Sequence, residues 1–232
     1  MTDIQDAVAV VTGGQRGLGR AFAAELLARG AAKVYVTARD PRADDDARIE
    51  AVALDVTDDR SVTALAELAH DATVVFNNAG VLHPSSLLTG PMTDVTGTFE
   101  TNVFGALRIA RAFAPVLAAN GGGALVDMHS LLSWGSGAGA YGASKAALWS
   151  ITNSLRTELA SQGTHVVGVH LGFADTDMVA AMPGDKLAPA EVATIVLDGI
   201  EQGEIEILVD DVTRHFKRAL SGPVEGLAVP LG

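Results

Sequence analysis

The sequence contains no cysteine, which excludes disulfide bonds, thiolate metal ligands and cysteine nucleophiles. Positive charge is also scarce, because 16 Lys and Arg stand against 28 Asp and Glu, for a formal net charge of −12. A chain this acidic is not expected to bind nucleic acid or an anionic membrane through its overall charge. A large acidic protein partner is disfavoured for the same reason. Chemistry on a small molecule in a pocket stays open.

Long hydrophobic runs and a basic leader are missing as well. The uninterrupted apolar runs are far shorter than the roughly 20 residues of a membrane-spanning helix. No basic region precedes the first apolar run, so we find no secretory signal. The composition, 48% hydrophobic and 19% charged over 232 residues, is typical of a soluble globular protein. We expect a cytoplasmic protein in which residues 1–232 form a single domain.

Short β-rich runs alternate with longer helical patterns along the chain. Several runs are almost continuously apolar, as in strands covered on both faces of a parallel sheet. The alternation predicts an α/β fold with a doubly wound, seven-stranded parallel sheet. The expected strands are Val8–Thr12, Val34–Ala38, Ile49–Leu54, Val74–Asn77, Ala124–His129, Val166–Leu171 and Ile205–Val209. The expected helices are Leu18–Arg29, Ser61–His70, Val95–Ala119, Gly142–Ser161 and Pro189–Gln202.

The expected helix at residues 95–119 is apolar on more than one side. One face carries Phe99, Val103, Leu107 and Ala110, and other faces carry Phe104, Ile109 and Val116. A helix buried on a single face does not need this pattern. We favour an oligomer interface, with deep burial inside the monomer as the alternative.

A glycine-rich stretch, TGGQRGLG at residues 12–19, joins the first strand to the first helix. Gly13, Gly17 and Gly19 permit a tight turn and a close approach of the backbone to a pyrophosphate. The N-terminus of the helix would supply N–H donors and a favourable dipole. The strand–turn–helix context predicts a dinucleotide site.

The end of the second expected strand bears on which dinucleotide binds. A carboxylate at this place holds a ribose 2′-hydroxyl, whereas Arg accommodates a 2′-phosphate. Here the small Ala38 is followed by Arg39, and Arg16 in the glycine loop can converge on the same place. Asp40 argues the other way, since it can pair with Arg39 or face the ribose. We favour NADP(H), with NAD(H) as the alternative.

Tyrosine is scarce, and one of the two tyrosines stands in a pattern suited to proton transfer. Tyr141 follows a Gly/Ser-rich stretch, and Lys145 comes four residues later in an expected helix. Positions i and i+4 share a helix face, so the ammonium can lie beside the phenol. A fixed positive charge would lower the pKa of the tyrosine from about 10 toward the working pH. The spacing alone is also common on solvated helix faces.

Together these residues resemble the short-chain dehydrogenase/reductase family over essentially the whole chain. The shared motifs are the glycine loop, Asp55-Val56, NNAG at 77–80, Asn102 in TNVFG, Ser130, YGASK at 141–145 and LGFADTDM at 171–178. The resemblance implies a Rossmann fold, hydride transfer between a nicotinamide and a ketone, aldehyde or secondary alcohol, and a homotetramer or homodimer.

The resemblance implies four catalytic residues. Tyr141 would exchange a proton with the substrate oxygen, and Ser130 would stabilise charge developing on it. Lys145 would bind the nicotinamide ribose and lower the pKa of Tyr141, and Asn102 would hold a water that links Lys145 to solvent.

The resemblance also implies binding positions. The cofactor would contact Gly13, Gln15, Arg16, Gly17, Leu18, Gly19, Arg39, Asp55, Val56, Asn78, Ala79, Gly80, Tyr141, Lys145, Gly172, Ala174 and Thr176. The substrate pocket would be lined by Leu132, Trp134 and Phe173, with ordinary packing as the alternative for the two aromatic residues.

Other histidines and the tail have simpler interpretations. His129 should point away from Ser130, since neighbouring strand residues face opposite sides. His83, His165 and His170 show no metal-ligand spacing with acids, so no metal is expected. Trp149 is expected to pack, and the tail GPVEGLAVPLG to be a loosely ordered end or to reach a neighbouring subunit.

The chain departs from the family pattern at several places. Ser130 lies eleven residues before Tyr141, two fewer than is usual, and Leu171 stands where the family has proline. The crossover after Arg39 is a short polar stretch, and the lid between Thr176 and Pro189 is short. We expect a loosened nicotinamide segment and an open site of broad or small-ketone specificity.

The sequence thus predicts an NADP(H)-dependent oxidoreductase. A 3-oxoacyl carrier-protein reductase is one alternative, although its acidic partner would want a basic rim. A non-catalytic NADP(H)-binding sensor is another, although such a protein is expected to lack part of the catalytic set.

Overall fold

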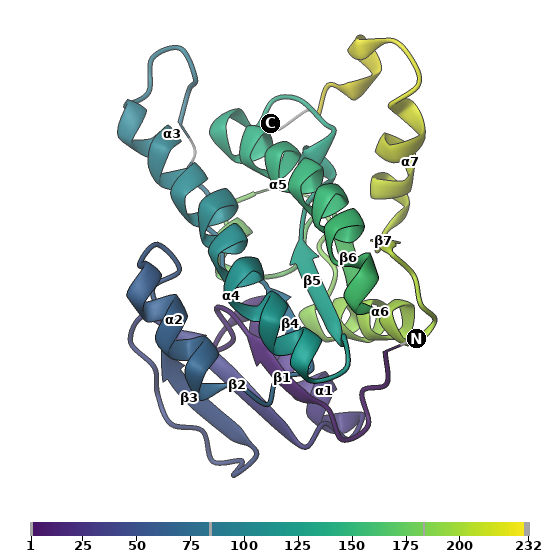
Figure 1. The fold of residues 1–232 in the computed structure, drawn as a ribbon. Coiled ribbons are helices and arrows are strands. Elements are labelled where there is room, and N and C mark those ends of the chain that lie inside the picture. Colours follow the sequence, from purple (N-terminus) through teal and green to yellow (C-terminus); the bar gives the residue numbers. More distant parts are fainter. Residues whose placement is uncertain (1, 84, 183, 230–232) are drawn as a thin grey trace.

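The computed structural model describes residues 2–83, 85–182 and 184–229. Its seven strands form one sheet in the order β3-β2-β1-β4-β5-β6-β7, and every pair is parallel (Figure 1). The strands are β1 Val8–Val11, β2 Lys33–Ala38, β3 Ile49–Ala53, β4 Val74–Asn77, β5 Ala124–Met128, β6 His165–His170 and β7 Glu206–Leu208. The doubly wound, seven-stranded parallel α/β fold is confirmed. The strand order reverses between β1 and β4, where ligands bind such sheets.

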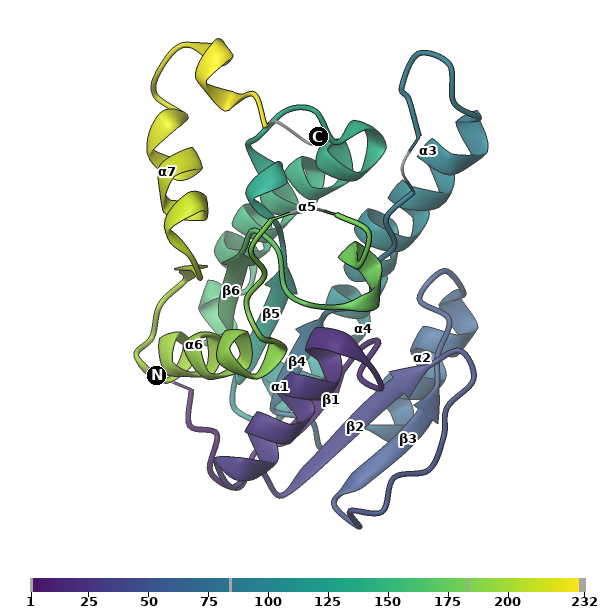
Figure 2. The same cartoon turned by 180° about the vertical axis from the view of Figure 1, so that it is seen from behind.

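Helices cover both faces of the sheet. α1 Gly17–Ala28 and α6 Pro189–Glu201 lie on one face (Figure 2), and α2 Asp59–Leu68, α4 Ala106–Ala119 and α5 Gly139–Glu158 lie on the other. Alternation along β1 supplies both sides of the core: Ala9 and Val11 pack toward α1 and α6, and Val10 packs toward α2 and α4. The turn between β2 and β3 contains no helix in the described chain, as predicted.

The expected helix at 95–119 is longer and is interrupted by a π-helical turn. α3 Met92–Phe99 leads into the π turn Glu100–Gly105 and then into α4. The whole stretch Met92–Ala119 has 28 residues, and an 18-residue window within it has a mean hydropathy of 1.2, enough to cross a membrane by length and composition alone. In the fold 44% of that window is buried, and α4 packs on α2, β4 and β5.

Burial within the chain accounts for part of the apolar residues on that helix. Ile109, Phe113 and Leu117 are fully buried. Phe104 is 47% exposed, and Leu107 is half-buried. Burial inside the monomer therefore explains part of the pattern, and an oligomer interface at Phe104 and its half-buried neighbours stays a prediction.

The C-terminal part contains a helix that the sequence did not predict. α7 Asp211–Ala219 begins where the Asp210 side chain accepts a hydrogen bond from the Thr213 N–H (2.7 Å). Beyond it, Leu227–Val229 lies beside the loop before α5: Ser136 N–H donates to the Leu227 carbonyl (2.8 Å) and Val229 N–H donates to the Ser136 carbonyl (3.1 Å). The expectation of a loose tail is wrong for residues 227–229, and a contact with a neighbouring subunit stays a prediction; residues 230–232 lie outside the described chain.

Candidate active site

The catalytic residues implied by the sequence come together at the carboxyl end of the sheet. Ser130 follows β5 and caps the short 3-10 helix Leu131–Ser133, while Tyr141 and Lys145 lie on successive turns of α5. α5 begins at Gly139, three residues earlier than predicted, so Tyr141 lies in its first turn. The Ser130 side chain acts to lower the pKa of the Tyr141 phenol, and its Oγ accepts a hydrogen bond from the Leu132 N–H (3.2 Å).

Asn102 fixes the loop after β4 with a two-way hydrogen bond. Its side-chain oxygen accepts from the Val81 N–H (2.8 Å), and its Nδ2 donates to the Val81 carbonyl (2.9 Å) and to Ser144 Oγ (3.1 Å). Ser144 Oγ in turn donates to the Tyr141 carbonyl (2.7 Å). The π turn at Asn102 thus ties the NNAG segment to the first turn of α5, and π turns of this kind often lie at functional sites.

Lys145 is buried, with 6% of its surface exposed. Its Nζ donates a 2.6 Å hydrogen bond to the Met128 carbonyl. Burial lowers the pKa of Lys145 to about 8, and the nearby Asp127 carboxylate acts in the opposite direction. Asp127 is itself fully buried between Asn77 Nδ2 (2.8 Å) and Thr152 Oγ1 (2.6 Å).

The expectation that Lys145 lowers the pKa of Tyr141 is wrong for this structure. Burial raises the pKa of Tyr141 to about 12, and the Ser130 side chain opposes this only in part. The Lys145 ammonium lies 5.8 Å from the centre of the tyrosine ring and is bound to the Met128 carbonyl. Tyr141 is therefore protonated at neutral pH, a state suited to giving a proton away.

The glycine loop forms a cradle beside these residues. Gly17 has a φ of +51°, and a Cβ there would lie 3.1 Å from Cγ2 of Thr176. Arg16 makes no side-chain hydrogen bond to the first turn of α1, so within the described chain these N–H groups stay uncapped. Such a helix start fits a pyrophosphate. Thr12 Oγ1 braces the loop by accepting from the Asn78 N–H (3.0 Å) and the Ala79 N–H (2.9 Å).

The adenosine side of the site is open to solvent. Arg16, Arg39 and Asp55 are exposed, and the charge of Arg39 helps to lower the pKa of Asp55, after the hydrogen bonds from Thr57. Gln15 joins the glycine loop to the turn after β2, because its side-chain oxygen accepts from the Arg42 N–H (2.9 Å). Val56 is buried against Gly105.

The segment after β6 is held by hydrogen bonds at the place where the proline is replaced. The Leu171 carbonyl accepts from the Leu131 N–H (2.9 Å), and the Gly172 N–H donates to Asp210 Oδ2 (2.7 Å). Leu187 N–H donates to the Phe173 carbonyl (2.9 Å), which closes the base of the loop that carries Thr176. These bonds anchor the segment at both ends, and the expected loosening by the replaced proline stays a prediction.

The residues expected in the substrate pocket do not share one environment. Phe173 is half-buried, whereas Leu132 and Trp134 are 8% and 6% exposed and pack with Phe216 of α7. The Trp134 ring stacks on His170 at 4.1 Å between ring centres. We therefore correct the interpretation of Trp134 to packing. His129 is buried beside His170, in keeping with its expected orientation.

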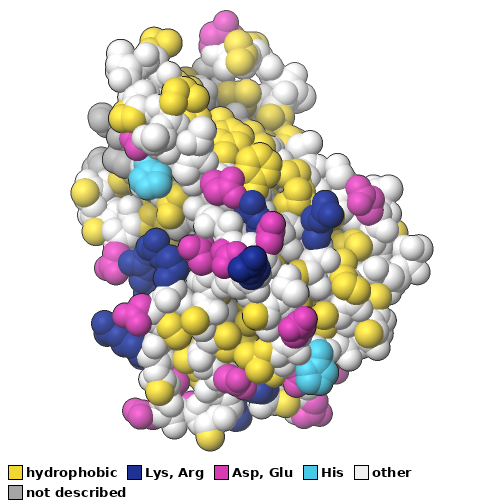
Figure 3. Space-filling view, turned by 60° about the vertical axis from the view of Figure 1, so that its left-hand side comes forward, with side chains coloured by type: hydrophobic (Ala, Val, Ile, Leu, Met, Phe, Trp, Pro, Cys, Tyr) yellow, Lys and Arg dark blue, Asp and Glu magenta, His cyan; other side chains and the backbone are white. Residues whose placement is uncertain are grey.

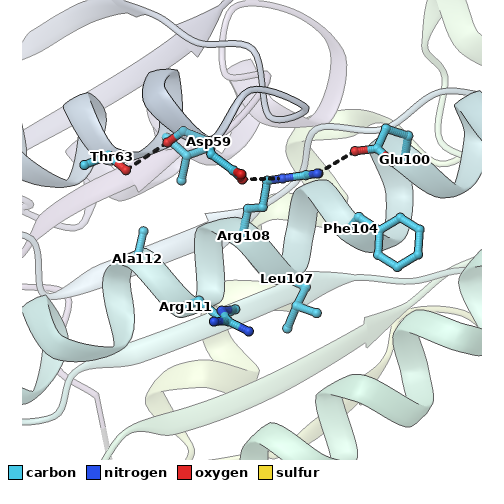
Figure 4. A pocket seen from close by; sticks show the side chains of 9 residues that line it. Asp59, Thr63, Glu100, Phe104, Leu107, Arg108, Arg111 and Ala112 are labelled. Carbon is cyan, nitrogen blue, oxygen red and sulfur yellow. Dashed lines mark hydrogen bonds and ion pairs between the residues drawn. The ribbon is translucent and has the colours of Figure 1, made fainter.

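A separate cavity of about 530 Å³ lies between α2 and α4 (Figure 4). Arg108 crosses it, with ion pairs to Asp59 (2.7 Å) and Glu100 (2.6 Å), and Phe104 and Leu107 flank it. Its lining includes neither the candidate catalytic residues nor the glycine loop.

Several residues of the site were missed by sequence reasoning. Ser144, Thr12, Asp127 and Val81 act through hydrogen bonds to motif residues that are distant in sequence. Ser144 lies in YGASK and Thr12 begins the glycine-rich stretch, so their places in these motifs could have indicated them as site residues. The Val81 bond is made by backbone atoms and leaves no trace in residue type.

Comparison with known proteins gives the family. The model of the short chain dehydrogenase family matches residues 7–186. The chain is 33% identical to 1-deoxy-11-beta-hydroxypentalenate dehydrogenase of Streptomyces exfoliatus, over 97% of this chain and 94% of that protein. Among solved structures, a short chain dehydrogenase from Burkholderia cenocepacia in complex with NADP has a TM-score of 0.91 at 33% identity, over 97% of both chains.

A second solved structure carries the other cofactor. It is a short chain dehydrogenase/reductase from Burkholderia phymatum in complex with NAD, with a TM-score of 0.82 at 25% identity, over 95% of this chain and 96% of that one. The fold, the order of motifs and these matches agree. This chain is an oxidoreductase of the short-chain dehydrogenase/reductase family.

Proposed function

We propose that this oxidoreductase transfers a hydride between NADP(H) and a ketone or aldehyde, or the matching secondary alcohol. The observation that carries the proposal is that Ser130, after β5, and Tyr141, on the first turn of α5, lie with the buried Lys145 of the next turn at one end of the sheet. A Cβ built on Gly80 would lie 3.3 Å from Asn102 Oδ1 and 4.0 Å from Lys145 Nζ, so the NNAG turn adjoins the catalytic residues.

Each catalytic residue has a role that its environment supports. Tyr141, protonated at neutral pH, donates its proton to the substrate oxygen during reduction, and Ser130 binds the same oxygen. A bound nicotinamide supplies the hydride in reduction and accepts it in oxidation. Lys145, whose ammonium donates to the Met128 carbonyl in the structure, would hold the ribose hydroxyls of the cofactor, and Asn102 holds the backbone that surrounds the proton path.

NADP(H) is preferred over NAD(H) because Arg16 and Arg39 stand exposed at the adenosine side of the cradle. Two guanidinium groups suit a 2′-phosphate. Asp40 is the counter-argument for NAD(H), and the solved relatives hold either cofactor. Leu132 and Phe173 contribute to the substrate pocket, and the short lid favours small or varied ketones.

The protein works in the cytoplasm as a homodimer or homotetramer. The α2–α4 side supports association, since Phe104 is 47% exposed there. On the face seen in Figure 3, hydrophobic side chains gather on both sides of a band of Lys, Arg, Asp and Glu. Light scattering of the purified protein tests this part.

Two other functions remain alternatives. A 3-oxoacyl carrier-protein reductase uses the same chemistry, but its acidic partner would meet a chain of net charge −12. A sensor that binds NADP(H) without turnover has no need of Ser130, Tyr141, Lys145 and Asn102 together, and this chain has all four.

The deciding experiment measures NADPH and NADH oxidation without and with a panel of acetophenone-like and bulky ketones. We expect ketone-dependent NADPH oxidation that exceeds NADH oxidation. Binding of NADPH without turnover of any ketone or alcohol would favour the sensor. Turnover confined to carrier-linked substrates would favour the carrier-protein reductase.

A further inference from the structure

A buried aromatic cluster lies directly behind Ser130 and takes no part in the mechanism above. We call it the imidazole–indole cluster; its members are His129, His170, Trp134, Trp149, Glu206 and Lys217. His170 is at its centre and is 0% exposed. The His170 ring stacks between His129, 4.7 Å away between ring centres, and Trp134, 4.1 Å away.

The His170 ring reaches the backbone of the catalytic serine. Its Nδ1 lies 3.2 Å from the Ser130 carbonyl oxygen. A carbonyl oxygen only accepts hydrogen bonds, so Nδ1 must carry the proton. The same oxygen also accepts from the Ser133 N–H (3.0 Å), and these two bonds use both of its lone pairs. The Ser130 peptide is thus held from two directions.

The other ring nitrogen, Nε2, faces Glu206 and makes no hydrogen bond among the described residues, so packing and the Nδ1 bond position the ring. His170 Nε2 lies 3.7 Å from Glu206 Oε1. Glu206 is ion-paired with Lys217 (2.6 Å) and accepts a hydrogen bond from Trp149 Nε1 (3.1 Å). The Lys217 ammonium lies 4.9 Å and 5.0 Å from the rings of Trp134 and Trp149. Strand β7 and helix α7 therefore hold the cluster in place.

The charge state of His170 follows from burial. Burial lowers the pKa of His170 to about 4, although Glu206 opposes the shift. The imidazole is neutral at pH 7, and the Ser130 carbonyl selects the tautomer with the proton on Nδ1. Gly168 makes room for the stacked rings, because a Cβ there would lie 3.1 Å from His129 Cδ2.

The position that His170 holds matters for chemistry. Ser130 lies where β5 ends and the 3-10 helix begins, and the loop from there to Tyr141 is short. We propose that His170 is a positioning residue: its Nδ1–H holds the Ser130 carbonyl so that the Ser130 hydroxyl faces the substrate oxygen. This inference rests on the proposed function, since it needs Ser130 to bind that oxygen.

The test compares His170→Asn with His170→Gln. The Asn amide can donate from the place of Nδ1, whereas the longer Gln amide donates from the place of Nε2. We expect His170→Gln to lower kcat for ketone reduction about tenfold, as for loss of a hydrogen bond to a positioned group. His170→Asn should recover most of that loss. The KM for NADPH should not change in either variant.

Two outcomes overturn the inference: full kcat in His170→Gln, or equal kcat losses in both variants with equal thermal stability. A wild-type protein without turnover defeats the proposed function instead. In that case, nitrogen-15 NMR of the wild-type histidines still tests which ring nitrogen of His170 carries the proton. A proton on Nδ1 at pH 7 supports the inference, and a proton on Nε2 contradicts it whatever the activity.

Discussion

Lys145 Nζ and the carbonyl oxygen of Met128 are 2.6 Å apart, so the buried ammonium is held by the strand below α5. The bond draws the ammonium toward β5, 5.8 Å from the centre of the Tyr141 ring. Burial is the largest influence on the pKa of both side chains. It lowers the pKa of Lys145 to about 8 and raises that of Tyr141 to about 12. A direct effect of Lys145 on Tyr141 therefore requires the ammonium to leave the Met128 carbonyl.

Replacing this lysine should stabilise the fold while it removes activity. The folded pKa of Lys145, about 8, lies below its ordinary value of 10.5, so the unfolded chain binds more protons between these values. Stability rises with pH across that window, and the buried charge is a cost at pH 7. Lys145→Met should raise the free energy of unfolding at pH 7 by about 2 kcal/mol. Chemical denaturation at pH 7 and pH 10.5 measures this, and a loss of stability at pH 7 would contradict it.

Asp127→Asn should shift the pH dependence of turnover toward lower pH. Asp127 is the negative charge that opposes the lowering of the Lys145 pKa. Arg156, on the same helix as Lys145, lies near Asp127, and the neutral His129 lies near Lys145. The Asn amide can keep both hydrogen bonds of the Asp127 carboxylate. Its oxygen can accept from Asn77 Nδ2, and its own Nδ2 can donate to Thr152 Oγ1, whose proton then goes to the Leu148 carbonyl. The alkaline limb of kcat against pH should move to lower pH, with unchanged thermal stability. If the alkaline limb lies at the same pH in the wild type and in Asp127→Asn, Asp127 does not influence the pKa of Lys145.

Arg39→Ala should change cofactor preference more than activity. Loss of a charged hydrogen bond to a 2′-phosphate costs about 1.5–3 kcal/mol, so KM for NADPH should rise roughly tenfold to a hundredfold. KM for NADH is the internal control and should stay within about twofold. Equal effects on both cofactors would show that Arg39 does not read the 2′-phosphate.

Deleting the chain from Leu227 onward should impair Tyr141 from a distance. The two hydrogen bonds to Ser136 hold the loop before α5, and together they are expected to contribute about 1–2 kcal/mol. We expect a lower unfolding temperature and a lower kcat, with little change in KM for NADPH. Val224→Ser, at a position that is 72% exposed, is the matched control and should behave as wild type.

Local sequence patterns were sufficient for the sheet. Strand β4 has the predicted bounds, and the other strands differ by a residue or two, because apolar runs covered on both faces are unambiguous. The π turn at Asn102 was not predictable, because it depends on a bond to Val81 across the site. Helix α7 was missed because its segment is polar, with only Thr213 and Phe216 buried.

The sequence predicted which residues lie together in the candidate site, and it did not predict their electrostatics. Motif spacing pointed to Ser130, Tyr141 and Lys145, and the fold gathers them. The pKa of Tyr141 depends on how deeply α5 seats the phenol and on where Lys145 finds a partner. Residue type alone predicts neither the burial of the phenol nor the partner of Lys145. The position of His170 behind Ser130 likewise depends on packing between β6 and α7.

The central claim is that Tyr141 is the proton donor of an NADPH-dependent carbonyl reduction. The most direct measurement compares ketone-dependent NADPH oxidation, and NADPH binding by fluorescence, in the wild type and in Tyr141→Phe. We predict turnover in the wild type, at least a thousandfold loss of kcat in the variant as an order-of-magnitude estimate, and the same Kd for NADPH in both. Turnover by Tyr141→Phe within about tenfold of wild type would contradict the account.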